Sequence, residues 1–206
     1  VETGKIRIGC FPTVSFAWIS TLIAIFKDNH PNIAIEVIEE NGIKNLEQWL
    51  NQGIIDIGVF SKQPYHNYDW AGVREDHYVA LFHKEHRLAA LEQVPVKQLF
   101  DEDLVLFKSH EGIDQDVVKV MEYVEMDKVP KYTSNSDFTV IRLTEQLGFV
   151  ALIPELIAKI AVNFFDVTYR PIDVNVSREL GFAVRDVKRV SPAVRQLLKY
   201  VKEEKF

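Results

Sequence analysis

Cysteine and long apolar runs are scarce in this chain of 206 residues. Cys10 is the only cysteine, so an intramolecular disulfide is impossible, which is typical of a protein that folds in the reducing cytoplasm. No run of about 18 apolar residues occurs, so we expect no membrane-spanning helix. Residues 1–4 contain no apolar stretch of the kind found in signal peptides. We therefore expect a cytoplasmic protein.

Cys10 itself allows two interpretations. Its thiol could sense oxidation, or it could serve as a small apolar residue at the end of a strand. The second interpretation is favoured because an unpaired cysteine is among the most commonly buried residue types.

Excess positive charge is also absent. The formal net charge is -6, while hydrophobic residues make up 47% and charged residues 26% of the chain. This composition is typical of a globular protein. A domain that holds the DNA backbone is usually basic, so we do not expect this chain to contact DNA itself.

Known catalytic and metal-binding patterns are missing as well. The chain has no Gly-x-Ser-x-Gly, P-loop or Gly-x-Gly-x-x-Gly motif. His77, His83 and His86 lie close in sequence, but a strand would place His77 and His83 roughly 20 Å apart, too far to share one metal ion. We therefore predict no catalytic residues, no metal site and no cofactor.

Helical and strand patterns alternate along the whole chain, which indicates an α/β fold with largely parallel sheets. Strands are predicted over residues 5–11, 33–39, 55–60, 70–74, 77–83, 104–107, 131–133, 149–153, 167–171 and 179–184. Helices are predicted over residues 15–29, with Thr13 or Ser15 as the N-cap, 45–52, 116–125, 138–145, 155–162 and 191–202. Residues 84–93 form a polar stretch without clear periodicity.

The alternating pattern begins again after this polar stretch, which predicts two similar lobes. We assign residues 1–84 and 186–206 to the first lobe and residues 85–185 to the second. A cleft between two such lobes is the expected ligand site.

The predicted helices over residues 15–29 and 116–125 are apolar on more than one face. Each therefore needs a second partner besides its own sheet. Burial under local loops is one solution, and an antiparallel homodimer is the other. We predict a dimer interface formed by Trp18, Ile19, Leu22, Ile23, Val117, Val120, Met121 and Val124, and we expect Ile19→Glu to disrupt it.

Six short motifs, in order along the chain, resemble the effector-sensing domain of LysR-type transcriptional regulators. They are Gly4-Lys5-Ile6-Arg7-Ile8-Gly9, Leu22 to Phe26 followed by His30-Pro31, Gly53-Ile54-Ile55-Asp56-Ile57-Gly58, His86 with Leu88-Ala89, Gly148 through Pro154, and Ser191-Pro192-Ala193. Two positions depart from the family pattern: Arg87 replaces a usual Pro, and Gln146 stands where a Gly commonly ends a helix. Gln146 puts the local geometry of the second lobe in doubt.

This resemblance implies two Rossmann-like lobes with a hinge and central cleft, as in type 2 periplasmic binding proteins. It implies that a small metabolite binds in the cleft and controls transcription. DNA would be bound by an N-terminal winged helix-turn-helix domain, which is absent from this chain. Family members are commonly tetramers built from dimers. A stand-alone solute-binding protein of a transporter and a small enzyme on the same fold are the alternatives.

Polar residues at strand ends and helix starts match the positions where this family binds effectors. The predicted ligand-binding residues are Pro12, Thr13, Val14, Ser15, Phe16, Phe60 and Ser61 in the first lobe, and Lys108, Ser109, His110, Asn135, Ser136, Asp137 and Phe138 in the second. Lys108 favours an anionic ligand, whereas Asp137 prefers an amine, so a carboxylate or an amino acid is the expected effector class. Simple capping and turn chemistry is the alternative role of the Ser, Thr and Asn residues.

Overall fold

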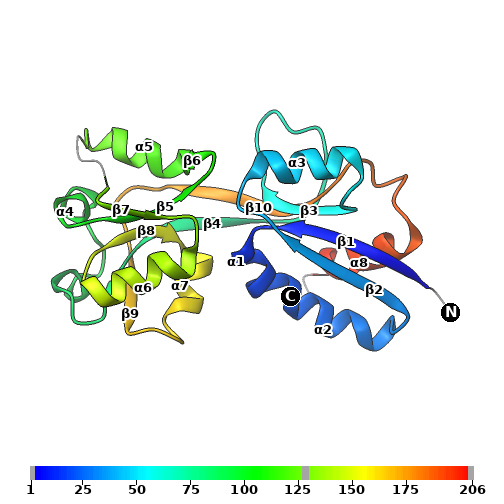
Figure 1. Ribbon diagram of the computed structural model, residues 1–206, viewed down its shortest axis with the longest axis horizontal. Coiled ribbons are helices and arrows are strands. Elements are labelled where there is room, and N and C mark those ends of the chain that lie inside the picture. The colour runs from blue at the N-terminus through cyan, green and yellow to red at the C-terminus, as the bar shows by residue number, and fades with distance from the viewer. Residues whose placement is uncertain (1–2, 127–129, 204–206) are drawn as a thin grey trace. The chain divides into compact units, whose positions relative to one another are not determined.

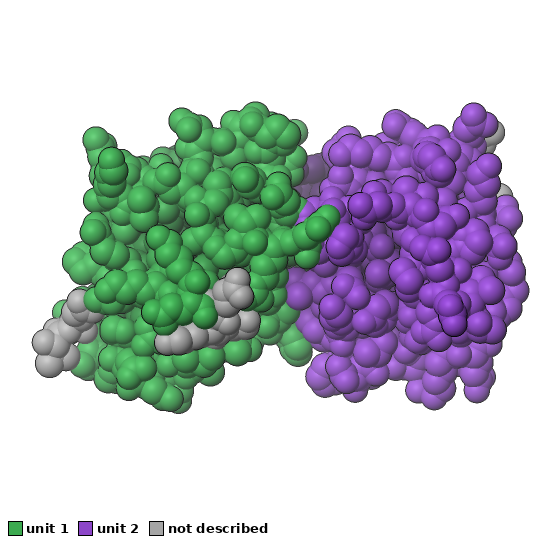
Figure 2. All heavy atoms as spheres, turned by 180° about the vertical axis from the view of Figure 1, so that it is seen from behind, with its two compact units in different colours: residues 1–75, 179–206 green, residues 76–178 purple. Residues whose placement is uncertain are grey.

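A computed structural model describes residues 3–126 and 130–203 and divides them between two compact units. Unit 1 comprises residues 1–75 and 179–206, and unit 2 comprises residues 76–178 (Figure 2). The boundaries thus fall at residues 75/76 and 178/179, before the expected boundaries at 84/85 and 185/186.

Unit 1 is a twisted sheet with helices on both faces. Its elements are β1 (Gly4–Cys10), α1 (Pro12–Val14), the π-helical turn η1 (Ser15–Ile19), α2 (Ser20–Asn29), β2 (Ile33–Glu39), α3 (Ile43–Gln52), β3 (Ile57–Ser61) and α8 (Pro192–Lys202). Strand β1 pairs in parallel with β2 and β3, while β10 (Ser177–Val184) pairs antiparallel to β3. Helix α3 covers one face, and α2 and α8 cover the other (Figure 1).

The first helix begins earlier than predicted. Its N-cap is Phe11, and Pro12 occupies the first helical position, where its missing N–H costs nothing. Neither Thr13 nor Ser15 is the N-cap, so that prediction was wrong. The predicted continuous helix is also interrupted by η1, in which the Ser20 amide donates to the Ser15 carbonyl.

Unit 2 also places its strands between helices, and three of them form a separate sheet. Its elements are η2 (Arg87–Ala90), α4 (Val96–Asp101), β5 (Val105–Ser109), β6 (Gly112–Ile113), α5 (Gln115–Tyr123), β7 (Tyr132–Ser134), α6 (Asp137–Leu147), β8 (Ala151–Pro154), α7 (Glu155–Ala161) and β9 (Val167–Pro171). One core cluster lies between the sheet, α4 and α5, and another lies between the sheet, α6 and α7. The sequence patterns gave no sign of η2, α4 or β6.

Strand β4 (Asp69–His83) corrects another prediction, because residues 70–74 and 77–83 form one strand. Gly72, with a φ of 55°, supplies a local irregularity within it. Both β4 and β10 contribute residues to each unit. The final part of β4 pairs antiparallel with β8 and β9 in unit 2.

Candidate functional site

In unit 1, the chain brings the two predicted groups of ligand residues together at the end of the sheet. The Phe11 amide donates to the Val59 carbonyl over 3.4 Å, so the start of α1 lies beside the end of β3. Phe16 is 49% exposed, and Pro12 and Ser15 are half-buried. These three residues remain accessible on unit 1.

Phe60 does not have the expected role of stacking on a ligand. Its side chain is fully buried, and its ring packs edge-on against His66, Tyr68 and Trp70, with centroid distances of 5.6, 6.1 and 5.6 Å. Thr13 and Val14 are also buried, and Ser61 is nearly so. The apolar ends of these strands therefore serve mainly to pack unit 1.

Cys10 lies buried at the end of β1. The pKa of its thiol is raised to about 12, mainly by burial and to a smaller extent by Glu39, although a hydrogen bond with Ser15 lowers it. Very little reactive thiolate therefore forms near neutral pH, which favours the packing role over the redox role.

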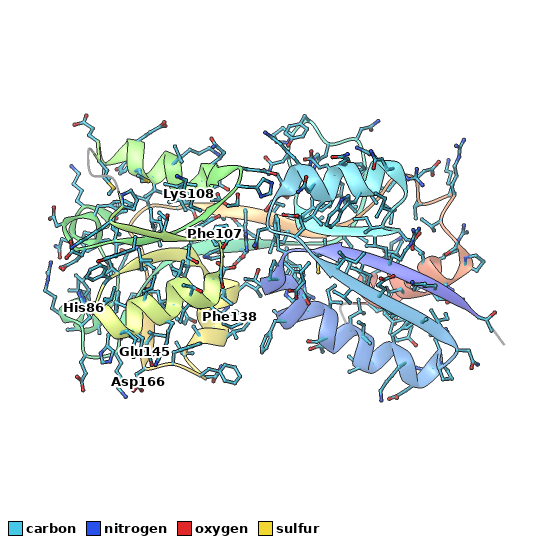
Figure 3. The ribbon with its side chains drawn as sticks, viewed as in Figure 1. His86, Phe107, Lys108, Phe138, Glu145 and Asp166 are labelled. Carbon is cyan, nitrogen blue, oxygen red and sulfur yellow. The ribbon has the colours of Figure 1, made fainter. Side chains whose placement is uncertain are left out.

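Unit 2 also gathers its predicted residues at one edge of a sheet. Strands β5 and β7 are parallel, and Phe107 lies opposite Ser134. The next residues along the two strands, Lys108 and Asn135, therefore come at the same edge of the sheet. Lys108 and Ser109 are part of β5 rather than following it, and His110 lies in the turn to β6. Figure 3 shows Phe107 and Lys108 on β5 and Phe138 at the start of α6.

Helix α6 begins with Ser136 as its N-cap, whose hydroxyl accepts from the Thr139 amide over 3.3 Å. Its first residue is Asp137, and Phe138 is 39% exposed. The helix ends at Gly148 in the left-handed conformation, so the departure at Gln146 leaves a normal C-cap.

Four residues that the sequence analysis missed complete this part of unit 2: Asp76, Tyr78, Asp114 and Arg178. The Arg178 guanidinium donates to Oδ2 of Asp76 from Nε over 3.1 Å and from Nη2 over 2.9 Å. The other Asp76 oxygen accepts from the Leu156 amide at the start of α7 over 2.9 Å. Asp76 is therefore both an ion-pair partner and a helix cap.

Asp114 has a similar capping role at α5, where its carboxylate accepts from the Asp116 amide over 2.8 Å. The pKa of Arg178 is lowered by burial but raised overall by Tyr78, Asp76 and Asp114. The N-terminal ends of α5, α6 and α7 thus gather charged groups around Arg178.

Asp137, in the first turn of α6, also interacts with this cluster. Its pKa is raised to about 6, mainly by burial and to a smaller extent by Asp114 and Asp76, although Arg178 lowers it. Tyr78 is also buried, and Arg178 and Asp114 act on its hydroxyl. Burial raises the pKa of Tyr78 well above its ordinary value.

The sequence did contain a signal for this cluster. Asp76 and Arg178 are charged residues within or beside apolar strand patterns, and a buried charge requires a partner of opposite sign. Pairing the two would have required knowledge that β4 and β10 return to the same region.

The predicted dimer residues are largely internal. Trp18, Ile19, Leu22, Val117 and Val120 are buried within their own chain, and Ile23, Met121 and Val124 are half-buried. These five side chains, from η1, α2 and α5, are buried against other residues of this chain, so they offer no surface to a second copy. The local-burial alternative accounts for these five residues.

No group of three or more metal-binding side chains occurs among the residues that the structure describes. His86 instead caps η2, where its Nδ1 accepts from the Leu88 amide over 3.3 Å. Burial lowers the pKa of His86, while Glu102 raises it.

Within residues 3–126 and 130–203, no helix is long and apolar enough to cross a membrane.

Comparisons with known proteins agree with this architecture. The sequence is 24% identical over 204 residues to the uncharacterized HTH-type transcriptional regulator YvbU of Bacillus subtilis (strain 168), covering 98% of this chain and 68% of YvbU. The fold is similar to the effector-binding domain of QuiR in complex with shikimate, with a TM-score of 0.82, 15% identity, and coverage of 98% and 99%. It is also similar to the BenM effector-binding domain with its effector benzoate, with a TM-score of 0.76, 19% identity, and coverage of 99% and 93%.

These likenesses confirm the predicted α/β fold of the type 2 periplasmic-binding-protein class. They give no support to the transporter alternative. The family described as LysR substrate binding domain matches residues 1–205. The chain therefore belongs to the LysR substrate-binding domain family.

Proposed function

We propose that this domain senses a small metabolite for a cytoplasmic LysR-type regulator and thereby controls transcription. The match to the LysR substrate-binding family over residues 1–205 carries this proposal. DNA would be contacted through an N-terminal winged helix-turn-helix domain in the full-length regulator. The family is one of transcriptional regulators, so no catalytic role is proposed.

Each unit, taken by itself, carries predicted effector-binding residues that remain accessible. In unit 1 these are Pro12, Ser15 and Phe16, and in unit 2 they are Lys108, Ser109, His110, Asn135, Ser136, Asp137 and Phe138. Polar groups at the ends of strands are typical binding positions in α/β sheets, and Phe16 and Phe138 offer exposed rings to an apolar part of the ligand. A carboxylate or an amino acid fits this mixture of charges.

A thermal-shift screen of the domain against carboxylates, amino acids, amines, sugars and inorganic anions tests the proposal. A true effector at a hundred times its dissociation constant should stabilise the folded domain by about 2.7 kcal/mol. A screen in which no class stabilises the folded protein would count against the sensing role.

We also propose a homodimer, and a tetramer for the full-length regulator. Because Ile19 and Leu22 are internal, the interface would involve exposed side chains of α2 such as Ile25, which is 37% exposed. Sedimentation of the isolated domain should give a dimer at micromolar concentration. Sedimentation as a monomer would exclude a stable dimer of this domain.

A further inference from the structure

The last segment of unit 1 differs in charge from the rest of the chain. Residues 185–203, the loop after β10 and helix α8, carry six basic and two acidic side chains, whereas the whole chain has a formal net charge of -6. The six basic residues are all exposed and comprise Arg185, Lys188, Arg189, Arg195, Lys199 and Lys202. Positive charge is therefore concentrated in one surface segment of an acidic chain.

Helix α8 places three of these cations on one face. Arg195, Lys199 and Lys202 are spaced at i, i+4 and i+7, so they lie on the side of the helix opposite to its buried residues. They extend over roughly 10 Å of the helix axis. The Arg195 guanidinium donates to the Lys188 carbonyl over 3.3 Å, which brings the loop before α8 beside this face. We name Lys188, Arg195, Lys199 and Lys202 the basic band.

The cations of the basic band have no acidic partner. Within residues 3–126 and 130–203, none of the four forms an ion pair, and Lys199 donates instead to Oε1 of Gln196 over 3.0 Å. Arg189, by contrast, pairs with Asp186 over 3.4 Å and is not part of the band. Several like charges thus lie close together without compensation, which is unfavourable unless an anion binds across them.

Neither surface position nor the helix dipole accounts for this arrangement. Other exposed lysines do have acidic partners: Lys5 pairs with Glu36 over 2.6 Å, Lys119 with Asp116 over 2.8 Å and Lys159 with Glu155 over 3.1 Å. The dipole favours Lys199 and Lys202 in the last turn of α8, but it disfavours Arg195 close to the helix N-terminus. The band as a whole therefore points to an external anion.

The basic band offers charge with little apolar contact surface. Between residues 185 and 203, all of which the structure describes, Val187 is the only large hydrophobic residue that is exposed, at 36%. Specific protein partners need buried aromatic or apolar anchors, and lysine is depleted at their interfaces. The phosphate backbone of a nucleic acid needs mainly cations. The composition of this face therefore favours a nucleic acid over an acidic protein.

We propose that the basic band contacts the phosphate backbone of duplex DNA, in addition to the contacts of the helix-turn-helix domain. The choice of DNA among nucleic acids rests on the proposed regulatory function. The contact is independent of base sequence, because phosphate contacts carry no sequence information directly. The acidic remainder of the chain does not prevent it, since exposed charges more than about 10 Å apart are largely screened at about 0.1 M salt. The net charge of the chain averages over this local band.

Fluorescence anisotropy with two labelled duplexes of unrelated sequence, each of about 20 base pairs, tests the proposal on the complete chain at about 50–200 mM salt. The band variant combines Arg195→Gln, Lys199→Gln and Lys202→Gln. The control variant combines Lys5→Gln, Lys119→Gln and Lys159→Gln, which removes the same charge from other exposed positions. Poly-L-glutamate, tested as a competitor, represents an acidic protein surface.

Wild type should bind both duplexes equally, and log K should fall with log salt with a slope of about -3 for three or four phosphate contacts. The band variant should bind at least about tenfold more weakly at about 50 mM salt, with a much smaller slope, and the control variant should stay within about twofold of wild type. A variant with Lys199→Arg and Lys202→Arg keeps the charge and should bind like wild type. All substituted side chains are exposed, so every variant should keep its melting temperature.

Equal weakening by the band and control variants would overturn the proposal, because it would show attraction to overall charge. Absence of binding by wild type at about 50 mM salt would overturn it as well. Tighter binding of the band to poly-L-glutamate than to DNA would assign this face to an acidic protein instead. Each of these outcomes would leave metabolite sensing untouched, since the thermal-shift screen tests that function separately.

Discussion

Units 1 and 2 differ in what they place at the ends of their central strands. In unit 1, the side chains of Val14 and Phe60 at these positions have no exposure to solvent, and Thr13 is only 3% exposed. Unit 2 instead surrounds Arg178 with carboxyl groups and the Tyr78 hydroxyl. Both units follow the same α/β pattern, so the comparison shows that similar folds can have different chemical roles. Unit 1 places buried apolar side chains at these strand ends, and unit 2 places charged groups there.

The largest effect is expected from placing a charge in the apolar unit. Ile19→Glu should destabilise unit 1 by more than about 4 kcal/mol, because Ile19 is only 1% exposed and the carboxylate would have no partner. Ile54→Glu, at an exposed position of unit 1, is the matched control. Ile54 is 44% exposed, so its change should cost less than about 1 kcal/mol.

Urea unfolding of both variants measures these differences. Equal stability of Ile19→Glu and wild type, with loss of a dimer, would restore Ile19 as an interface residue and contradict its role in the core.

The next largest effect is expected at the centre of the charged unit. Arg178→Met should destabilise the domain by about 3–5 kcal/mol, because it leaves Asp76 buried without its ion-pair partner. Arg142→Met is the control in the same unit. Arg142 pairs with Glu145 on α6 but is 57% exposed, so removing it should cost at most about 1 kcal/mol.

Denaturant unfolding compares the two arginine variants directly. Equal effects would show that the Asp76–Arg178 pair is no more important than a surface pair.

A smaller effect of opposite sign is expected from Asp137→Asn. The folded-state pKa of Asp137, about 6, lies above the ordinary value of 3.8, so the native state binds more protons between these values. The contribution of Asp137 to stability is therefore fully present below pH 3.8 and is lost as pH rises through about 6. At pH 8, Asp137→Asn should be more stable than wild type by about 1–3 kcal/mol.

At pH 4 this difference should largely disappear. Unfolding free energies of wild type, Asp137→Asn and Asp103→Asn across this pH range measure the effect. Asp103→Asn, at an exposed position of unit 2, should show no comparable gain at pH 8. Destabilisation by Asp137→Asn at pH 8 would mean that the carboxylate is well compensated in the native state.

The smallest effect is expected at Cys10, where the change is in reactivity rather than stability. A pKa of about 12 against an ordinary value of 9.0 reduces the thiolate fraction about a thousandfold. Ellman's reagent at pH 7.5 should therefore modify the native domain very slowly and the urea-unfolded domain quickly. Rapid modification of the native protein would revive the redox interpretation.

The sequence predicted the overall fold well because its apolar periodicity is strong. Residues 33–39 and 167–171 were predicted as strands with the bounds that the structure has. The two-part prediction of β4 failed because the acidic pair Glu75 and Asp76 resembles a break between strands. The strand continues through this pair, and Asp76 is buried with Arg178 as its ion-pair partner.

The candidate site was predicted less completely. Strand ends and helix starts are visible in sequence, so Ser136 and Asp137 could be found from the local pattern. Phe60 was misassigned because an aromatic residue at a strand end looks the same whether it faces a ligand or other rings. Arg178 was missed because its partners come from segments far away in the chain.

Amide NMR of the isotopically labelled domain tests the central claim most directly, with phenethylamine, L-phenylalanine and hydrocinnamate added in separate titrations. The account predicts that a compound that binds the domain shifts the amide signals of Lys108, Ser136 and Phe138 most strongly in unit 2. Binding that leaves the signals of all three residues unchanged would contradict the account.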